Sequence, residues 1–294
     1  MTVRFTVLAS GSGGNVSLLE ANGFGLVVDA GLGPRQIATR LRTIGRAWCD
    51  VHAVLLTHTH SDHWTEATLA HVARHRIPLY CHPTHARRLR ESSAAFADLQ
   101  AARLVRAYRE GSEFAPGPGL RCRPLALDHD DRPTFGFRID GDGNLFNRRW
   151  SLAYVADSGT WDDELVAACA DVDLLALEFN HDVAMQRSSG RPQSLIARVL
   201  GDDGHLSNEQ AAEFLRELLL RSRPGRPRDL VQLHLSRDCN RPAAAVRAAR
   251  SVLDKLRSDT AVHTAQQDRP TPSFTLGTPR EPARQRASTA AAQS

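Results

Sequence analysis

The sequence predicts a single α/β domain arranged as a four-layer αβ/βα sandwich, with two sheets packed face to face and helices on both outer faces. Three observations predict this class. The chain has 294 residues, enough to bury a large core. Strand-like apolar runs alternate with helical patterns along it. These patterns fall into two consecutive blocks of similar size, and each block can form one sheet with its own covering helices.

The first block leads from the N-terminus into a histidine-rich segment. Pro34 suits the first position of a helix, apolar residues recur after it at helical spacing, and Gly45 ends that helix. A second helix is expected over residues 65–74. The strands of this block are expected at residues 3–8, 17–20, 25–29, 51–56 and 77–81.

The second block repeats the pattern. Thr160 and Asp163 have the spacing of a helix capping box, and so do Ser207 and Gln210. Residues 140–150 predict an exposed hairpin insertion between two strands. Helices are expected at residues 161–169, from Ser207 onward and at 242–256, and strands at 120–127, 134–139, 152–156, 174–178 and 230–235.

The C-terminal stretch differs in composition. From Ser258 onward Thr, Pro, Ala, Gln and Arg dominate, and apolar residues are too sparse to offset the entropy of ordering the chain. We therefore expect one folded domain over residues 1–257 and a disordered tail over residues 258–294.

Composition bounds the class of protein. Hydrophobic residues make up 41% and charged residues 24% of the chain, which is typical of a globular protein, and no apolar run has bilayer length. The start of the chain lacks the pattern of a secretion signal, and the five cysteines are scattered without a CxxC pair. We expect a cytoplasmic protein without membrane contact. The net charge of +4 is compatible with a nucleic-acid partner, and no protein partner is predicted.

The segment Thr57-His58-Thr59-His60-Ser61-Asp62-His63 follows an apolar strand directly. In an extended chain His58 and His60 point to the same side, and Asp62 and His63 can reach an adjacent position as the chain turns into its helix. Imidazole and carboxylate together suit Zn²⁺, Mn²⁺ or iron. Because four candidate ligands are more than one structural ion normally takes from one segment, the spacing predicts two divalent ions, with zinc or manganese favoured.

Three later residues are further candidate ligands. His129, Asp157 and His234 each stand at the end of an apolar strand. Taken singly, each has an alternative interpretation as an ordinary polar residue at a strand end. Their shared placement, which matches that of His60, favours a role in the same metal centre.

The H-x-H-x-D-H motif with a later His, a later Asp and a last His resembles the ligand pattern of the metallo-β-lactamase superfamily. The resemblance implies the metallo-β-lactamase fold. It also implies that Asp29, in the segment VVDAG, supports the centre from behind. The implied assignment places His58, His60 and His129 on one ion and Asp62, His63 and His234 on the other, with Asp157 bridging the two.

Further motifs narrow the resemblance. SGSGGN at Ser10, HDDRPTFGF at His129, EFNHD at Glu178, GHLSN at Gly204 and HLSRDCNRP at His234 resemble the YycJ/WalJ subfamily of bacterial metallohydrolases, in register over residues 3–243. That resemblance implies nuclease activity on DNA.

The same resemblance suggests residues for catalysis. In the phosphodiesterase branch of the superfamily, a Glu after the bridging Asp and a later His before a helix transfer protons, and Glu178 and His205 occupy these positions here. We predict Asp62, Glu178 and His205 as catalytic residues. An alternative for His205 is a loop histidine bonded to the backbone.

Substrate contacts are predicted for five further residues. The glycine-rich loop could offer backbone N–H groups to a phosphate, although a tight hairpin turn explains the same glycines. Two more candidates follow Glu178 directly. The predicted substrate-binding residues are Ser10, Ser12, Asn15, Asn180 and His181.

We therefore predict a dinuclear metal-dependent hydrolase, a phosphodiesterase or exonuclease that cleaves DNA through a metal-bound hydroxide. Two alternatives stay open. One is a hydrolase of small esters, thioesters, lactones or cyclic nucleotides, because the fold does not fix the substrate. The other is a non-catalytic regulator that retains the metal site. An oxygen-reducing di-iron protein is disfavoured, because it would normally carry Glu in place of His60.

Overall fold

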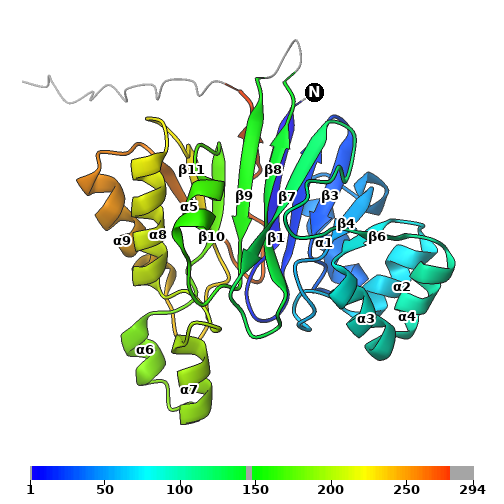
Figure 1. The fold of residues 1–294 in the computed structure, drawn as a ribbon, viewed down its shortest axis with the longest axis horizontal. Coiled ribbons are helices and arrows are strands. Elements are labelled where there is room, and N and C mark those ends of the chain that lie inside the picture. Colours follow the sequence, from blue (N-terminus) through cyan, green and yellow to red (C-terminus); the bar gives the residue numbers. More distant parts are fainter. Residues whose placement is uncertain (1, 144–147, 279–294) are drawn as a thin grey trace, which may run out of the picture.

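The computed structural model describes residues 2–143 and 148–278 and consists of two β-sheets packed face to face with helices outside them (Figure 1). The first sheet has seven strands in the order β13-β1-β2-β3-β4-β5-β6, and the second has six in the order β12-β11-β10-β9-β8-β7. The predicted four-layer αβ/βα sandwich is confirmed.

The first sheet is mixed. Strand β1 lies antiparallel to β2 and β2 antiparallel to β3, whereas β3, β4, β5 and β6 run parallel. Its strands are β1 (Val3–Ala9), β2 (Val16–Ala21), β3 (Phe24–Val28), β4 (Ala53–Leu55), β5 (Leu79–Cys81), β6 (Val105–Ala107) and β13 (Phe274–Leu276). Its helical segments are α1 (Pro34–Thr43), the 3-10 turn η1 (Trp48–Asp50), α2 (Glu66–Arg74), α3 (Pro83–Ser92) and α4 (Ala94–Ala101).

The second sheet is antiparallel on one side and parallel on the other. Strands β7, β8 and β9 form an antiparallel meander, and β9, β10, β11 and β12 run parallel. Its strands are β7 (Leu120–Leu127), β8 (Thr134–Gly141), β9 (Trp150–Val155), β10 (Leu174–Glu178), β11 (Asp229–Leu233) and β12 (Ala261–Thr264). Its helices are α5 (Asp163–Cys169), α6 (Val183–Arg187), α7 (Gln193–Leu200), α8 (Asn208–Arg221) and α9 (Pro242–Lys255).

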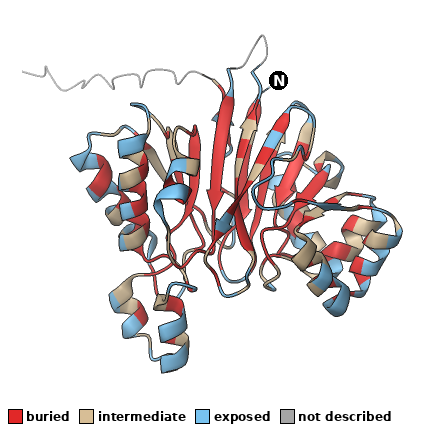
Figure 2. Ribbon diagram, viewed as in Figure 1, coloured by how far each residue is buried: buried red, intermediate tan, exposed pale blue. Residues whose placement is uncertain are grey.

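Apolar side chains form three layers of core. Between the sheets, Phe5 of β1 packs in one cluster with Phe137 and Tyr154 of the opposite sheet. A second cluster lies under the helices α1, α2 and α4, and a third under α5, α8 and α9, where Phe214 is fully buried. Figure 2 shows this arrangement, with buried strands in the middle and exposed residues on the outward helix faces. Burial on both faces of each sheet explains the continuous apolar runs in the sequence.

Local sequence sets most helix starts. Pro34 occupies the first position of α1, and the Ser207–Gln210 capping box at α8 is confirmed. The box predicted from Thr160 and Asp163 is wrong. Helix α5 begins at Asp163 because the Asp162 carboxylate accepts a hydrogen bond of 2.8 Å from the Leu165 amide and caps the helix two residues later than expected.

The predicted domain boundary at residue 257 needs correction. Strand β12 pairs in parallel with β11, and β13 pairs antiparallel with β1, so residues 261–276 complete an edge of each sheet. An edge strand needs few apolar residues, because backbone hydrogen bonds to its single neighbour hold it in place. In β13, Phe274 and Leu276 are buried, whereas all four residues of β12 are half-buried. The rest of the predicted tail, residues 279–294, lies outside the described residues.

The predicted hairpin connects β8 and β9, whose ends pair at Gly141 and Trp150. The flanking residues Asp142 and Arg149 are exposed as expected, and residues 144–147 lie outside the described part. Among the described helices, none combines the length and the apolar character needed to cross a bilayer.

Candidate metal centre

The candidate residues gather where parallel strands end. Asp29 follows β3, Asp157 comes two residues after β9, Glu178 ends β10 and His234 follows β11 directly. The histidine-rich segment follows β4, and His129 follows β7. Since the carboxyl ends of parallel strands meet at one edge of a sheet, and the two sheets face each other, these side chains converge.

The backbone at this edge is strained. Asp29, Asp157 and His234 have φ values of 58°, 60° and 53°, in the left-handed region that residues other than glycine rarely adopt. Such conformations persist where the surrounding structure enforces them, and they concentrate at functional sites. Here they turn three candidate side chains out of their strands toward a common centre.

The first cluster consists of His58, His60 and His129, whose ligand atoms lie within 4.8 Å of one another. The His129 Nδ1 atom donates to the Gly204 carbonyl at 2.8 Å, which fixes the tautomer and leaves Nε2 facing the cluster, 3.3 Å from His60 Nδ1. The Nδ1 atom of His58 lies 3.0 Å from the Thr57 hydroxyl, so its Nε2 is the free nitrogen.

The second cluster is formed by Asp62, His63 and His234. Asp62 Oδ2 lies 3.5 Å from His63 Nε2 and 3.4 Å from His234 Nε2. Asp157 joins the two clusters, because its Oδ2 lies 3.1 Å from His63 Nε2 and it also groups with His58 and His63 within 4.8 Å. The structure therefore brings all seven predicted ligands together, with Asp157 between the two sets.

Three buried ligand atoms make no well-aligned hydrogen bond among the described residues: His58 Nε2, Asp157 Oδ2 and His234 Nε2. The last two have only ion-pair contacts within the centre, to His63 and Asp62. A buried polar atom without a partner costs about 1–3 kcal/mol, and such atoms are rare in native structures unless a ligand or ion satisfies them. Imidazole nitrogens and carboxylate oxygens are also the donors that zinc and manganese prefer. The residues present thus fit a pair of divalent ions.

The electrostatics of the centre favour positive charge. Burial alone would lower the pKa of His63, but the carboxylates of Asp29, Asp157 and Asp62 outweigh it and raise that pKa well above its ordinary value. The pKa of His234 is likewise raised, against burial, mainly by Asp157. By contrast, burial and the neighbouring His63 hold the pKa of His58 well below its ordinary value, so it is a neutral imidazole suited to bind a metal.

A ring of buried partners orients the second cluster. Asp29 Oδ2 lies 2.8 Å from His63 Nδ1, and its carboxylate also accepts hydrogen bonds from the amide and hydroxyl of Thr57. Asn15 Nδ2 donates to Asp62 Oδ2 at 3.1 Å. Carboxylates behind ligating histidines raise metal affinity and set the tautomer, and Asp29 has the position expected for this role.

Glu178 links the centre to His205. Its fully buried Oε1 lies 2.9 Å from the Nδ1 atoms of both His205 and His234, and Oε2 accepts hydrogen bonds from the amides of Ser158 and Leu206. Burial would raise the pKa of Glu178, but the charge of His205 and the side-chain hydrogen bonds to His205 and His234 bring it to about 2, so the group is a carboxylate. His205 is only partly exposed and also lies 3.6 Å from Asp157, so a ligand role for it is geometrically open.

The predicted substrate residues divide into two groups. Ser10, Asn15, Asn180 and His181 are buried, whereas Ser12 is exposed. The Asn180 side-chain amide donates a hydrogen bond to the His234 carbonyl at 2.9 Å, and Ser10 Oγ accepts one from the His234 backbone amide at 2.8 Å. These contacts favour a positioning role for the buried residues. Direct contact with a substrate stays a prediction.

The contacts of the glycine-rich loop favour a tight turn over a phosphate-binding loop. The Gly11 amide donates to Asn15 Oδ1, and the Gly13 amide donates to Gln267 Oε1. The Gly14 amide donates back to the Gly11 carbonyl, and a Cβ atom at Gly14 would lie 2.4 Å from the Gly31 carbonyl oxygen. These amides are therefore occupied within the protein, and the glycines allow close packing beneath the second cluster.

Asp130 and Asp131 are site residues that the sequence reasoning missed. Asp130 Oδ1 lies 3.3 Å from His60 Nε2 and 3.4 Å from His129 Nε2, and its other oxygen pairs with Arg198 at 2.9 Å. Asp131 accepts hydrogen bonds from the Thr59 amide and hydroxyl, both at 2.6 Å. Their position directly after His129 was the available signal.

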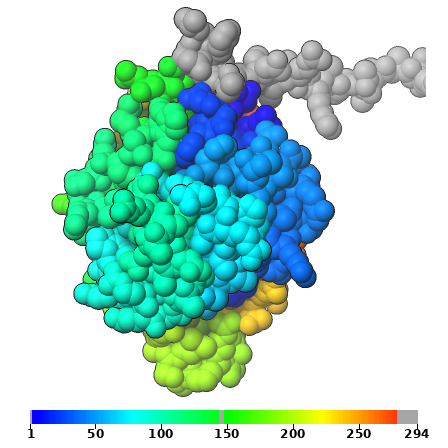
Figure 3. All heavy atoms as spheres, turned by 90° about the vertical axis from the view of Figure 1, so that its right-hand side faces the viewer, coloured from blue at the N-terminus to red at the C-terminus, as the bar shows by residue number. Residues whose placement is uncertain are grey.

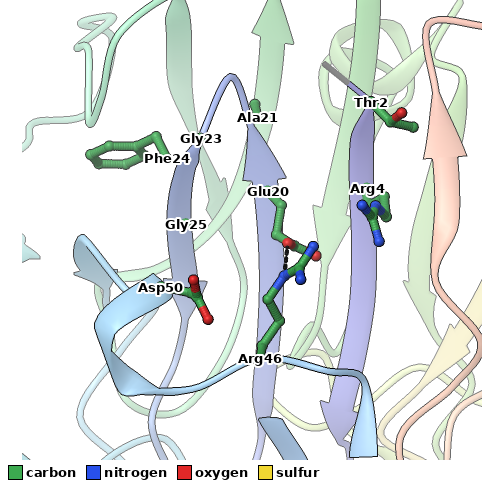
Figure 4. Close-up of a pocket in the computed structure, with 9 residues that line it drawn as sticks. All are labelled: Thr2, Arg4, Glu20, Ala21, Gly23, Phe24, Gly25, Arg46 and Asp50. Atoms are coloured by element: carbon green, nitrogen blue, oxygen red, sulfur yellow. Dashed lines mark hydrogen bonds and ion pairs between the residues drawn. The ribbon is translucent and has the colours of Figure 1, made fainter. Parts of the chain in front are cut away.

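A surface pocket of about 350 Å³ lies elsewhere (Figure 4). It surrounds the turn between β2 and β3, whereas Asn15 and Asp29 adjoin the opposite ends of these strands. Its charged groups include Glu20 and Arg46, which form an ion pair with each other. None of the candidate metal ligands lines it, so the candidate centre and this pocket are separate.

Comparison with known proteins agrees with this geometry. A family model described as "Beta-lactamase superfamily domain" matches residues 26–227. The exodeoxyribonuclease WalJ of Streptococcus pneumoniae serotype 2 (strain D39 / NCTC 7466) is 29% identical over 237 residues, 81% of this chain and 83% of that protein. The exodeoxyribonuclease YycJ of Bacillus anthracis is 25% identical over 255 residues, 87% and 90% of the two chains.

Solved structures share the architecture. The crystal structure of Zn²⁺-bound PqqB from Methylobacterium extorquens has a TM-score of 0.63 with this chain at 19% sequence identity. The match covers 91% of this chain and 99% of that one. At this level of identity the likeness shows the fold alone.

Proposed function

The chain belongs to the beta-lactamase superfamily, and from that premise we propose that it is a dinuclear phosphodiesterase that acts as an exonuclease on DNA. The broader class is fixed by the family and the clustered ligands: a metal-dependent hydrolase of the metallo-β-lactamase fold. The observation that carries the proposal is the pair of largely buried ligand clusters with Asp157 between them.

In this proposal His58, His60 and His129 hold one divalent ion and Asp62, His63 and His234 the other, with Asp157 between them. Zinc or manganese is the favoured metal. When bound, two such ions lower the pKa of water to about 7 and neutralise charge on a phosphoryl group. The protein's own contribution is to hold the ligands in fixed tautomers through Asp29, Gly204 and Thr57.

The residue proposed to move a proton to the leaving group is His205. Glu178 holds His205 Nδ1 at 2.9 Å, so Nε2 is the nitrogen free to face a substrate. Two backbone amides anchor the Glu178 carboxylate, which in turn fixes the orientation of the His205 ring. The pair thus has the arrangement of a general acid with its orienting carboxylate.

DNA is the proposed substrate because two relatives that match more than four-fifths of this chain carry the name exodeoxyribonuclease. The net charge of +4 agrees with a polyanionic substrate. Small esters and cyclic nucleotides are the competing substrates on the same fold.

The test uses the metal-reconstituted full chain. It is assayed on bis(p-nitrophenyl) phosphate, on a generic carboxylic ester, and on DNA labelled at either end. We expect phosphodiester cleavage, stepwise shortening of DNA from an end, two ions per active chain, and loss of both activities in Asp62→Ala. A chain that binds two ions yet hydrolyses only the carboxylic ester would contradict the proposal, as would full activity with a single ion.

A further inference from the structure

Residues 183–201 form a small lobe, the α6–α7 lobe, inserted between Glu178 and His205. Helices α6 and α7 project from the end of the molecule at which the parallel strands finish (Figure 1). In the view of Figure 3 the lobe stands out as a separate knob beyond the sheets. Its two ends adjoin the candidate centre, because it begins just after His181 and stops shortly before His205.

The charge of the lobe is one-sided. It contains Arg187, Arg191 and Arg198 and no aspartate or glutamate. The loops around the centre carry many carboxylates, including Asp130, which pairs with Arg198, and Asp238. The lobe is therefore a segment whose charged side chains are all cationic, next to loops that carry both acids and arginines such as Arg132 and Arg237.

The lobe is fixed to the loops that carry the ligands. Arg191 pairs with Asp238, in the loop after His234, at 2.7 Å. Arg198 pairs with Asp130, next to His129, at 2.9 Å. In addition, the Val199 carbonyl accepts a hydrogen bond of 3.1 Å from the His205 amide. These contacts join the lobe to the loops on both sides of the centre.

Arg187 is the cation that the lobe leaves available. It is exposed at the end of α6, and among the described residues it has no ion-pair partner. Ser188, next to Arg187 in the chain, and Ser194, in the first turn of α7, are exposed and neutral. An exposed guanidinium can bind a phosphate through two parallel hydrogen bonds, a geometry that lysine does not offer.

We propose that the α6–α7 lobe is the surface that binds the phosphate backbone of the nucleic-acid substrate as it enters the centre, with Arg187 as its principal contact. This inference rests on the proposed function. Because a backbone contact neutralises a phosphate and releases a counterion, the lobe supplies affinity that falls with salt and does not depend on base sequence.

The experiment measures binding of a fluorescent phosphorothioate DNA oligonucleotide, which resists cleavage, to the metal-loaded chain over a range of salt concentrations. The variants are Arg187→Glu and Ser194→Arg. The matched control is Arg250→Glu, which makes the same charge change at an exposed position on α9. Metal content and thermal melting show that each variant is folded and loaded.

We expect Arg187→Glu to lower affinity about fivefold to tenfold and to reduce the slope of log K against log salt by about one. Ser194→Arg should raise affinity, and Arg250→Glu should stay within about twofold of the wild type. In turnover, kcat/KM of Arg187→Glu should fall further on DNA than on bis(p-nitrophenyl) phosphate.

Equal losses in Arg187→Glu and Arg250→Glu would overturn the inference, because net charge alone would then explain binding. It would also fail if the wild type cleaves DNA and both lobe variants bind and cleave like it, a result that leaves the proposed function intact. If the wild type cleaves bis(p-nitrophenyl) phosphate but neither binds nor cleaves DNA, the proposed substrate is wrong and this inference falls with it.

Discussion

Several imidazoles of the centre have Nδ1 bonded to a fixed partner, which leaves Nε2 as the nitrogen that faces the site. The Asp29 carboxylate accepts a hydrogen bond from Nδ1 of His63. The Gly204 carbonyl accepts one from Nδ1 of His129, and the Glu178 carboxylate accepts one from Nδ1 of His205. Each partner sets a tautomer before any ligand binds. Substitution of one of these side-chain partners is therefore expected to change the orientation of the histidine ring and to leave the fold intact.

Asp130 provides a test at this scale. Its carboxylate lies 3.3 Å from His60 Nε2, which leaves His60 Nδ1 for the first cluster. We expect Asp130→Ala to weaken the ion held by His58, His60 and His129 by about 10- to 100-fold, measured by chelator competition. Asp130→Asn retains an oxygen acceptor and should keep most of the affinity.

The matched control for Asp130 is Asp128→Ala. This residue lies in the same loop and carries the same charge, but its one ion pair with a described residue is with the exposed Arg132. Equal metal affinity in the Asp130 and Asp128 alanine variants would show that Asp130 does not position His60.

His205→Ala tests the proposed proton donor. We expect turnover to fall by about 10²–10⁴-fold while metal content stays near the wild-type value. The deficit should shrink on substrates with p-nitrophenolate as leaving group, because that group departs without a proton. Loss of an ion in the variant would make His205 a ligand, and an equal deficit on all substrates would make it a binding residue.

At the scale of elements, short segments between the strands hold the site loops in place. The Asn240 amide nitrogen donates to the carbonyls of Phe179 and Asn180, and its oxygen accepts from Asn208 at the start of α8. Likewise His85 of α3 donates from Nε2 to the Pro133 carbonyl at 2.7 Å, in the loop that carries His129. Buried polar contacts of this kind fix loops that have little apolar surface of their own.

His85 makes stability depend on pH. Burial lowers its pKa to about 4 in the folded chain, below the ordinary value of 6.5 that it has when unfolded. Between these two pKa values, His85 is protonated in the unfolded chain and neutral in the folded chain. The stabilisation that follows is fully present above about pH 6.5 and is lost as the pH falls toward 4.

We expect the metal-free wild type to lose about 2 kcal/mol of unfolding free energy from this group between about pH 7.5 and pH 5. His85→Gln keeps a neutral donor for the Pro133 carbonyl and should show a correspondingly smaller loss in urea unfolding. The same pH dependence in both proteins would show that His85 is not the group responsible.

At the scale of the whole molecule, the last described residues join the two sheets to the site. Strand β12 extends the second sheet and β13 the first, and the connection between them passes over the glycine-rich loop. There Gln267 accepts from the Gly13 amide and donates to the Gly14 carbonyl, both at 2.8 Å. The loop in turn carries Asn15, which contacts Asp62.

Two truncations separate these roles. Removal of everything after Leu256 deletes both edge strands and Gln267, so we expect a lower melting temperature and loss of metal from the second cluster. Removal of residues 279–294 deletes a segment whose composition cannot build a core, and it should change neither quantity. Equal stability of the two truncated chains would show that β12 and β13 contribute nothing to the fold.

Much of the molecule follows from the sequence alone. The apolar periods located the strands that carry the ligands, because a buried strand must be apolar along its length. The H-x-H-x-D-H segment indicated a metal centre, since its ligands are neighbours in the chain. The Ser207 cap was readable for the same reason: its contact with Gln210 spans three residues.

Only the tertiary structure decided the rest. Strands β12 and β13 are ordered by backbone hydrogen bonds to neighbours distant in sequence, which no local composition records. Asp130 and Gln267 owe their places in the site to contacts with His60 and with the glycine-rich loop. The α6–α7 lobe, too, forms ion pairs with loops that lie elsewhere in the chain. Hydrophobic periodicity and helix capping involve residues close together in the chain, so the sequence predicts them. The contacts of Asp130, Gln267 and the two edge strands depend on which strands meet across the sandwich.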